Sequence, residues 1–427
     1  FFLADSRQCT FLREAGLVCG SFVFVFVDRL VVTVLGRMFF DRRGCAHLGL
    51  VFVVWVWGTW EITAGGVDTT PLPLRVRVFA NGASLATPED IALAPIVEGF
   101  SSAYDDPRSF GAFLQAETGV LPLTSSLQHF HAYPIEARNE LGVPVSSQNA
   151  TSSDGAAANV FLLPCGEGSN WYWPAFPLGT RVAVSLGTDT VELETLSVRP
   201  RVFKVHQLVT EGECKELVGR ALKSNALSRS EVGYGEVDEE DEGIEGLKYS
   251  KSRTSENMFD DGWSIARVLK HRIAEMLRVT PYNQGMFDGV QILRYNVSKA
   301  YDTHQDYFDE SDDSEMNFDA KTGGINRYAT VMLYLNSVTR GGETVFPLAD
   351  YSGEAQTSVT PAFLRSVGIV KGSWEETMVR ECETSLAVRA EKGAALLFYS
   401  LTPDGATDEY SLHGGCPVLE GEKMAAN

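Results

Sequence analysis

Four residues in the last third of the chain carry side chains that could bind a metal ion and an anion side by side. His304 and Asp306 stand two residues apart in the stretch YDTHQDYFDE, and His413 and Lys423 follow in SLHGGCPVLEGEKMAAN. Residues two apart on a strand point to the same face, so we expect His304 and Asp306 to aim together. An isolated H-x-D pair is more often an ordinary polar strand than a metal site, so the second histidine carries the argument.

The chemistry of this set favours iron over zinc. Two imidazoles and one carboxylate are the facial ligands of non-heme iron(II) oxygenases, and they leave positions open for a bidentate cosubstrate and O2. Zinc can also bind two histidines and an aspartate. However, zinc hydrolysis would not account for Lys423, because a buried lysine needs an anionic partner to offset its desolvation. A dicarboxylate whose other end chelates the metal would be such a partner.

The elements that must position these residues follow from caps and periodicity. Thr210 with Glu213 forms a capping box that predicts a helix through Lys223. A second helix is predicted over residues 262–278, and beyond Pro281 the apolar pattern alternates, as in strands. The strand segments are GVQILRYN, KAYDTHQDYF, RYATVMLYLN, GGETVFP, SLAVRAE, AALLFYSL, YSLHGGCPV and GEKMAAN. Helices followed by many short strands indicate an α+β fold with a sheet sandwich or barrel as its core.

Five motifs occur in order from about Pro200 to Asn427. They are SRTSENMF, QILRYNVSKAYDTHQDYF, RYATVMLYLNSVTRGGETVFP, KGAALLFYSLTPDGATDEYSLHGGCPV and GEKMAAN. In these motifs the chain resembles prolyl 4-hydroxylases of the collagen and plant cell-wall type, which are 2-oxoglutarate- and iron(II)-dependent dioxygenases. The resemblance implies a double-stranded β-helix (jelly-roll) catalytic domain with supporting N-terminal helices, preceded by a small β-rich region.

The resemblance also implies roles for individual residues in binding the metal and the cosubstrate. The implied iron ligands are His304, Asp306 and His413. Lys423 would pair with the distal carboxylate of 2-oxoglutarate, Thr344 of GGETVFP would hydrogen-bond the same carboxylate, and Tyr295 would contact the cosubstrate.

Four further residues have implied substrate-binding roles, namely Tyr301, Arg327, Arg253 and Ser255. By strict alternation Tyr301 falls on the opposite strand face from His304. Its role therefore requires a β-bulge or a strand that begins after it.

The activity implied by the resemblance is hydroxylation of peptidyl proline at C4, with decarboxylation of 2-oxoglutarate to succinate and CO2. Iron(II), O2 and L-ascorbate would be the accessory requirements, and a proline-rich or collagen-like protein would be the substrate. Two alternatives stay open on the residues alone. The enzyme could hydroxylate another side chain, such as lysine, or the chain could be a catalytically silent module that binds proline-rich peptides.

The sequence departs from the family pattern at its last strand and in one insertion. Met424 stands where the family usually has tryptophan, and the family usually continues with further strand residues beyond the position of Asn427. We therefore expect the wall of the cosubstrate pocket to be open there. The insertion at residues 348–384 is interpreted as surface elaboration.

The N-terminal region predicts passage through the secretory pathway. The chain opens with Phe1, and from Met38 it shows a basic pair, an apolar run from Leu48 to Trp60 and then small residues. This is the order of a signal peptide, and the run is short for a membrane span. We expect residues 1–64 to hold an upstream extension and a signal peptide, or an anchor that stays attached, and the protein to act in the lumen of the endoplasmic reticulum.

Composition agrees with a secretory enzyme. The formal net charge is −20 and no basic stripe occurs, which argues against a nucleic-acid partner. The cysteines beyond the expected signal peptide are widely spaced without C-x-x-C, which fits one or two disulfides, with Cys382 and Cys416 as candidates. Acceptor sequons for N-glycosylation occur at Asn149 and Asn296.

Three regions are predicted along the chain. Residues 1–64 form the extension with its signal peptide or anchor, and residues 65–199 form an irregular, β-rich N-terminal region. Residues 200–427 form the catalytic domain. Within the second region, the polar stretch Ser146–Asn159 is interpreted as a flexible linker.

Overall fold

The computed structural model of the chain divides into two units, Phe1–Pro71 and Leu72–Asn427. The residues described are 21–27, 30–40, 46–51, 74–100, 103–121, 134–150, 157–164, 170–230, 252–260, 262–279, 281–308, 326–350 and 359–427. In the first unit, β1 (Ser21–Val27), β2 (Leu30–Phe40) and β3 (Ala46–Val51) form an antiparallel sheet in that order. Most of the expected signal-peptide run lies outside the described residues, and no described helix is long and apolar enough to cross a membrane.

The second unit begins with a small four-stranded sheet in the order β5-β4-β7-β6. Strands β4 and β7 pair in parallel, and α2 lays Phe110 and Leu114 into the apolar core of this sheet. The elements are β4 (Arg75–Ala80), α1 (Pro88–Ala92), β5 (Ile96–Glu98), α2 (Pro107–Thr118), β6 (Ile135–Arg138) and β7 (Ala158–Pro164).

The linker interpretation of residues 146–159 is wrong where the structure describes them. Ser147 and Ala150 are buried, and Ala150 belongs to the apolar core beneath the small sheet. Residues 158 and 159 already belong to β7. Only residues 151–156 of this stretch lie outside the description. Polar composition predicted flexibility here because sequence alone does not show which small residues pack.

A nine-stranded antiparallel sheet forms the centre of the second unit, in the order β11-β12-β13-β22-β15-β19-β10-β9-β8. The antiparallel pair β8 and β9 precedes residue 200 and extends one edge of this sheet. The strands are β8 (Arg181–Leu186), β9 (Asp189–Ser197), β10 (Val202–His206), β11 (Ser228–Arg229), β12 (Glu256–Phe259), β13 (Gln291–Tyr295), β15 (Ala329–Tyr334), β19 (Ala395–Tyr399) and β22 (Lys423–Ala426).

A second, four-stranded antiparallel sheet has the order β14-β20-β17-β18, and a separate pair joins β16 and β21. Each of the eight strand segments predicted from alternation contains one of the observed strands. These smaller sheets contain β14 (Tyr301–His304), β16 (Arg340–Gly341), β17 (Thr344–Phe346), β18 (Leu386–Val388), β20 (His413–Gly415) and β21 (Val418–Glu420).

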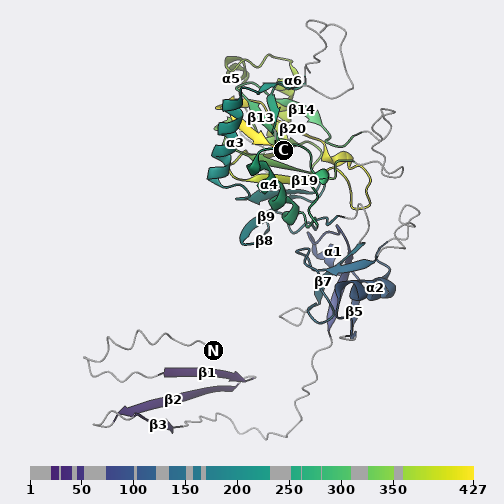
Figure 1. The fold of residues 1–427 in the computed structure, drawn as a ribbon, viewed down its shortest axis with the longest axis vertical. Helices are drawn as coiled ribbons and strands as arrows, with labels where there is room; N and C mark the ends of the chain where they lie inside the picture. Colours follow the sequence, from purple (N-terminus) through teal and green to yellow (C-terminus); the bar gives the residue numbers. More distant parts are fainter. Residues whose placement is uncertain are drawn as a thin grey trace. The chain divides into compact units, whose positions relative to one another are not determined.

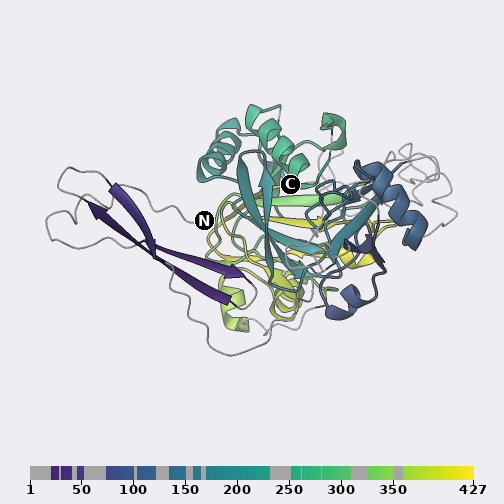
Figure 2. The same ribbon diagram turned by 90° about the horizontal axis from the view of Figure 1, so that it is seen from below.

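Two predicted helices cover one face of the large sheet, α3 (Glu211–Ser224) and α4 (Ser264–Met276). Thr210 and Glu213 make the expected capping box, which begins α3 at the predicted position. Glu213 also forms a 2.8 Å ion pair with Arg272 of α4, which ties the helices together. Both helices lie side by side against the sheet in Figures 1 and 2, with their apolar faces in one core cluster.

The other face of the large sheet packs against the second sheet. Along β19 the side chains alternate, with Leu397 in the cluster beneath the helices and Leu396 and Phe398 in the cluster between the sheets. Strand β22 alternates in the same way, so Lys423 points to the same side as Ala425, toward the space between the sheets. Two antiparallel sheets therefore enclose the core from which the candidate site opens.

The insertion at residues 348–384 is not only surface elaboration. It contains α5 (Pro361–Ser366) and α6 (Trp374–Thr384), and α6 packs on β14, β17 and β18. Met378 of α6 is 1% exposed and sits in an apolar cluster with Val345 of β17. The sequence analysis predicted strands on both sides of this insertion but not α6, the helix that packs on the second sheet.

Candidate active site

Three predicted ligands converge at one end of the second sheet. One ligand atom from each of His304, Asp306 and His413 lies within 4.8 Å of the others. The Nε2 atom of His304 is 3.6 Å from Oδ1 of Asp306, and Nε2 of His413 is 3.5 Å from Oδ2. This donor set, two nitrogens and a carboxylate around one point, fits a divalent transition metal with open positions.

Backbone hydrogen bonds fix the two imidazoles for ligation. Nδ1 of His304 lies 2.8 Å from the carbonyl oxygen of Asp302, and Nδ1 of His413 lies 2.9 Å from that of Ser411. A carbonyl can only accept, so each Nδ1 carries the proton and each Nε2 presents a lone pair toward the other ligands. The strand pairing reinforces this arrangement, because His304 and His413 are direct partners across β14 and β20.

Asp306 lies just beyond the end of β14, so the prediction that it shares a strand with His304 is wrong in detail. The chain turns after His304 and still brings the carboxylate to the two imidazoles. The Thr330 hydroxyl on β15 donates a 2.6 Å hydrogen bond to Oδ2 of Asp306. Thr330 is 9% exposed, so this bond is shielded from water and orients the carboxylate.

The protonation states also suit metal binding. Burial lowers the pKa of His413 to about 4, against the opposing effect of the Asp306 charge. Burial opposes ionisation of Asp306, but His413, His304 and the Thr330 hydroxyl outweigh it and hold the pKa of the carboxyl well below its usual range. At neutral pH the pair is therefore a neutral imidazole and a carboxylate, the forms that bind metal.

Tyr301 reaches the site because of the bulge that its predicted role requires. Tyr301 pairs with Gly415 and His304 with His413, so the register shifts between Tyr301 and His304. The extra residue returns Tyr301 to the ligand side, where its ring stacks on that of His304 with 3.8 Å between centroids. Of the two alternatives left open by the sequence, a bulge or a strand that begins after Tyr301, the structure shows the bulge.

Lys423 is buried between the sheets, beside Tyr295. Tyr295 and Lys423 are direct partners across β13 and β22, and Nζ lies 5.4 Å from the Tyr295 ring centroid. Lys423 is 2% exposed, so the expectation of an open pocket wall is wrong at this residue. Burial lowers the pKa of Lys423 to about 8, and the charge of Glu343 offsets only part of that effect.

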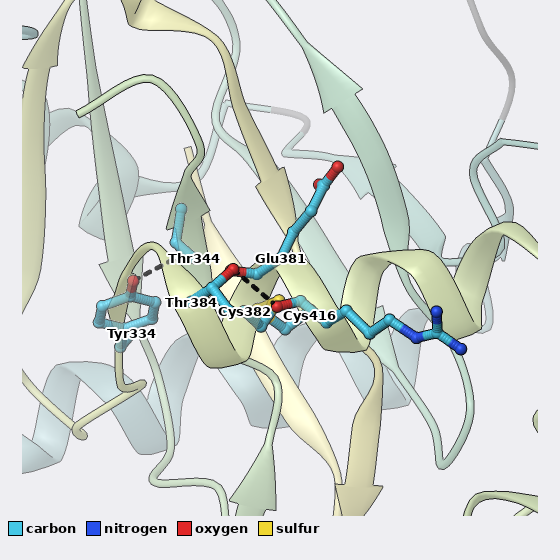
Figure 3. Close-up of a disulfide and its surroundings, with 7 residues drawn as sticks. Tyr334, Thr344, Glu381, Cys382, Thr384 and Cys416 are labelled. Atoms are coloured by element: carbon cyan, nitrogen blue, oxygen red, sulfur yellow. Dashed lines mark hydrogen bonds between the residues drawn. A yellow bond between two sulfur atoms is a disulfide. The ribbon is translucent and has the colours of Figure 1, made fainter. Parts of the chain in front are cut away.

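Thr344 is buried as well, and it has a partner, Tyr334, that was not predicted from the sequence. The hydroxyl of Tyr334 is 2.8 Å from Oγ1 of Thr344, and both side chains are buried (Figure 3). The Tyr334 ring also faces Lys423, whose Nζ is 5.6 Å from its centroid. Burial raises the pKa of Tyr334, so the phenol keeps its proton and can donate. From the sequence, a tyrosine in an apolar strand is expected to be a core residue, and only the contact with Thr344 shows the polar role of Tyr334.

Arg253 and Ser255 lie beside Tyr301. The guanidinium of Arg253 is 4.6 Å from the Tyr301 ring centroid, and its Nε donates a 3.3 Å hydrogen bond to Oγ of Ser255. Ser255 is fully buried and shares a 2.8 Å hydrogen bond with Ser230. In this structure Ser255 supports the arginine, and its contact with a substrate stays a prediction.

Arg327 stands on the more open side of the ligands. Its Nη1 donates a 3.2 Å hydrogen bond to the carbonyl of Asp306, and its Nε lies 3.1 Å from a carboxylate oxygen of Asp288. The Arg327 side chain is 44% exposed. It could therefore reach a ligand arriving from solvent.

A disulfide connects α6 to the strand that carries His413. Cys382 of α6 and Cys416 are bonded, and Cys416 follows β20 directly (Figure 3). The two sulfurs share an apolar cluster with Val345, the neighbour of Thr344. The pairing considered from sequence is confirmed. The disulfide links α6 to the residue after β20, the strand of His413, and packs against β17, the strand of Thr344.

Comparison with known proteins agrees with this geometry. Residues 290–427 match the model of the 2OG-Fe(II) oxygenase superfamily. Probable prolyl 4-hydroxylase 8 of Arabidopsis thaliana is 34% identical over 235 residues, which cover 55% of this chain and 69% of the relative. Prolyl 4-hydroxylase 5 of the same plant is 34% identical over 239 residues, covering 55% of this chain and 69% of the relative.

Solved structures show a more distant similarity. The 2OG complex of the viral collagen prolyl hydroxylase from Paramecium Bursaria Chlorella virus-1 is 20% identical, with a TM-score of 0.32, and covers 53% of this chain and 92% of that one. On the identity and coverage of its plant relatives, together with its oxygenase domain, this chain belongs to the prolyl 4-hydroxylase family of 2-oxoglutarate- and iron(II)-dependent oxygenases.

Proposed function

We propose that this enzyme hydroxylates peptidyl proline to 4-hydroxyproline and decarboxylates 2-oxoglutarate to succinate and CO2. The observation that carries the proposal is the joint placement of the His304, Asp306 and His413 ligand atoms and the buried Lys423 ammonium. A ligand set alone would suit many metal enzymes. A buried cation with no hydrogen bond or ion pair among the described residues asks for an anion as well.

The two histidines and Asp306 would hold iron(II), which when bound supplies the chemistry of O2 activation. Their Nδ1 hydrogen bonds keep the Nε2 atoms directed at one point, and Thr330 holds the carboxylate in place. Iron(II) and 2-oxoglutarate are the requirements of the family to which the chain belongs. L-Ascorbate is a further proposed requirement.

The distal carboxylate of 2-oxoglutarate would lie beside the buried Lys423, between the sheets. Lys423 would supply the charge, and Thr344 and Tyr334 would supply hydroxyl donors from adjacent strands. Tyr295 would form the wall facing the ammonium. A charge pair removed from water is strong, so this end would fix the cosubstrate and exclude water around it.

The peptide would lie across the open side of the ligands. Tyr301 and Arg253 form a stacked pair beside His304, and Arg327 lies near Asp306. An aromatic surface with adjacent cations suits proline rings and the free carbonyls of an extended chain. A polyproline II substrate would bind at low ordering cost, which favours proline-rich or collagen-like proteins. Ser255 would act here through Arg253.

The wider setting is also proposed. The two facing antiparallel sheets support a double-stranded β-helix, or jelly-roll, for the catalytic domain at residues 200–427. The Cys382–Cys416 disulfide supports action in an oxidising compartment, and we place the enzyme in the lumen of the endoplasmic reticulum. Its leader is proposed to be a signal peptide or an uncleaved anchor within residues 1–64.

The test measures succinate release and peptide mass together. The purified chain is incubated with iron(II), 2-oxoglutarate, ascorbate and either a poly-proline or a collagen-like peptide, and fragment spectra locate any added oxygen. A gain of one oxygen on proline with matching succinate supports the proposal. Oxygen added to lysine in a lysine-containing peptide, with proline untouched, would replace the substrate assignment. Peptide binding without succinate would identify a silent binding module.

A further inference from the structure

The tripeptide Asn296–Val297–Ser298 takes no part in the site, although it directly follows the cosubstrate residue Tyr295. It has the Asn-x-Ser form that oligosaccharyl transfer requires, and its middle residue is not proline. Tyr295 is 4% exposed and faces the core, so alternation directs Asn296 outward. Asn296 is exposed accordingly, and its side-chain amide makes no hydrogen bond among the described residues.

The backbone holds Asn296 at the start of a turn. The amide of Lys299 donates a 3.0 Å hydrogen bond to the carbonyl of Asn296, and the amide of Ser298 donates a 2.8 Å bond to the carbonyl of Val418. Ser298 has a φ of 68°, in the left-handed region. The acceptor asparagine is therefore presented on a fixed loop outside the sheet.

A hollow of about 290 Å³ adjoins this asparagine. The residues that line it are all of polar or charged type, and the aliphatic parts of their side chains also face the hollow; they are Arg229, Thr254, Glu256, Arg294, Asn296 and Lys299. A sugar has hydroxyls that donate and accept hydrogen bonds and C–H faces that pack on aliphatic carbon, so this mixed lining suits the first residue of a glycan.

The hollow lies away from the substrate residues. Thr254 and Glu256 line it, whereas Arg253 and Ser255, which alternate with them, are buried toward Tyr301. Residues that alternate along an extended segment point to opposite sides. A glycan in the hollow would therefore leave the face that binds the peptide uncovered.

The second sequon, at Asn149, offers a contrast. Asn149 is exposed like Asn296, but its Oδ1 accepts a 2.7 Å hydrogen bond from the amide of Ser146, and the next residue, Ala150, is 3% exposed in the core of the small sheet. The asparagine is thus folded back onto its own loop.

We propose that Asn296 is an N-glycosylation site. Its Nδ2 displaces the diphosphate of a polyprenyl-diphosphate-linked oligosaccharide at C1 of the first sugar. A C–N bond forms, the C–O bond breaks so that polyprenyl diphosphate leaves with its electron pair, and the amide nitrogen releases one proton to the solvent. The proposal rests on passage of the chain through the secretory lumen, as proposed above.

The experiment supplies that passage independently. The full chain is secreted from a eukaryotic host behind the host's own leader, followed by a short tag that carries a reporter sequon. Peptides are digested with a glycan-releasing amidase in ¹⁸O-water, which converts each glycosylated asparagine to a labelled aspartate. We expect the label at Asn296 in wild type and in Asn149→Gln, and its loss from this peptide in Asn296→Gln and in Ser298→Ala.

The reporter separates failure of the site from failure of delivery. A glycosylated reporter with unlabelled Asn296 overturns the proposal, whatever the native location of the enzyme. Succinate release is measured before and after native deglycosylation, and we expect it to be unchanged because the hollow faces away from Tyr301. Loss of turnover on removal of the glycan, with the melting temperature unchanged, would overturn the proposed placement. Neither readout depends on proline being the residue hydroxylated.

Discussion

The two ends of the active site differ in how far water reaches them. The metal end is partly open, since the side chains of His304 and Asp306 are 23% and 13% exposed. The cosubstrate end is closed, with Lys423 at 2% and Thr344 at 1%. Ligands at the open end have hydrogen-bond partners already in place, whereas the lysine at the closed end has none among the described residues. The open end is thus preorganised for a metal and a large substrate, and the closed end is completed only by a small anion.

Removal of a metal ligand at the open end should cause the largest loss of metal affinity and of activity. In Asp306→Ala the two histidines remain, but the charge that the metal requires is gone. We expect iron affinity and succinate release to fall by more than the roughly 100-fold that loss of an outer partner costs. Calorimetric titration with Mn(II) measures the metal affinity without turnover. Asp288→Ala, at an exposed carboxylate near Arg327, serves as the control and should retain the metal.

A substitution at the closed end should weaken 2-oxoglutarate binding and leave metal binding at the open end unchanged. Lys423→Met removes the charge and keeps an unbranched side chain, so we expect a loss of about 2 kcal/mol or more in 2-oxoglutarate binding, roughly 30-fold or more in KM. Mn(II) affinity should be unchanged. The matched control is Lys215→Met, at a lysine of α3 with 70% side-chain exposure. An unaltered KM for 2-oxoglutarate in Lys423→Met would refute the assigned role of the lysine.

A substitution of Thr330 tests whether a residue that is not itself a ligand orients the Asp306 carboxylate for metal binding. Thr330→Val keeps the shape and removes the hydroxyl, leaving Oδ2 of Asp306 without its 2.6 Å partner. We expect metal affinity to weaken by about 10-fold or more. Thr330→Ser restores the donor and should recover most of the affinity. If valine and serine weakened the metal equally, packing rather than the hydrogen bond would be responsible.

Per pH unit, the smallest effect is a pH dependence confined to the closed end. The pKa of Lys423 lies near 8 because burial disfavours its charged form. Below that pH the ammonium is already present, whereas above it the free enzyme must take up a proton to bind the dianion. We therefore expect the KM for 2-oxoglutarate to rise toward tenfold per pH unit above about 8. A flat KM profile from pH 7 to 10 would contradict this.

The sequence predicts the strands well because alternation and capping are short-range rules, and it predicts the ligands because their residue types stand in motifs that resemble a known family. Alternation located β13, β15, β19 and β22, and the capping box placed the start of α3. The H-x-D spacing, a second histidine and a later lysine were enough to predict one cluster with an ammonium near it. The conflict between the family role of Tyr301 and strict alternation predicted a bulge or a later strand start, and only the structure decides for the bulge.

The sequence could not show which side chains contact one another when their helices or strands are far apart in the chain. Tyr334, Thr330 and Met378 each look like ordinary strand or helix residues until their neighbours are known. The hydroxyl pair of Tyr334 and Thr344, the support of Asp306 and the packing of α6 depend on which elements meet. The same limit explains the wrong linker interpretation, since Ser147 and Ala150 are polar or small yet buried.

Strand β22 comes last in chain order but lies inside the large sheet, between β13 and β15. Its neighbours, synthesised long before it, have no partner along those edges until it arrives. Ribosomal synthesis must therefore deliver nearly the whole catalytic region before the sheet can close, and chaperones would have to shield the exposed edges in the meantime. Strand β22 also carries Lys423. A polypeptide released before β22 is synthesised would therefore lack both the strand that joins β13 to β15 and the lysine proposed to bind the keto acid.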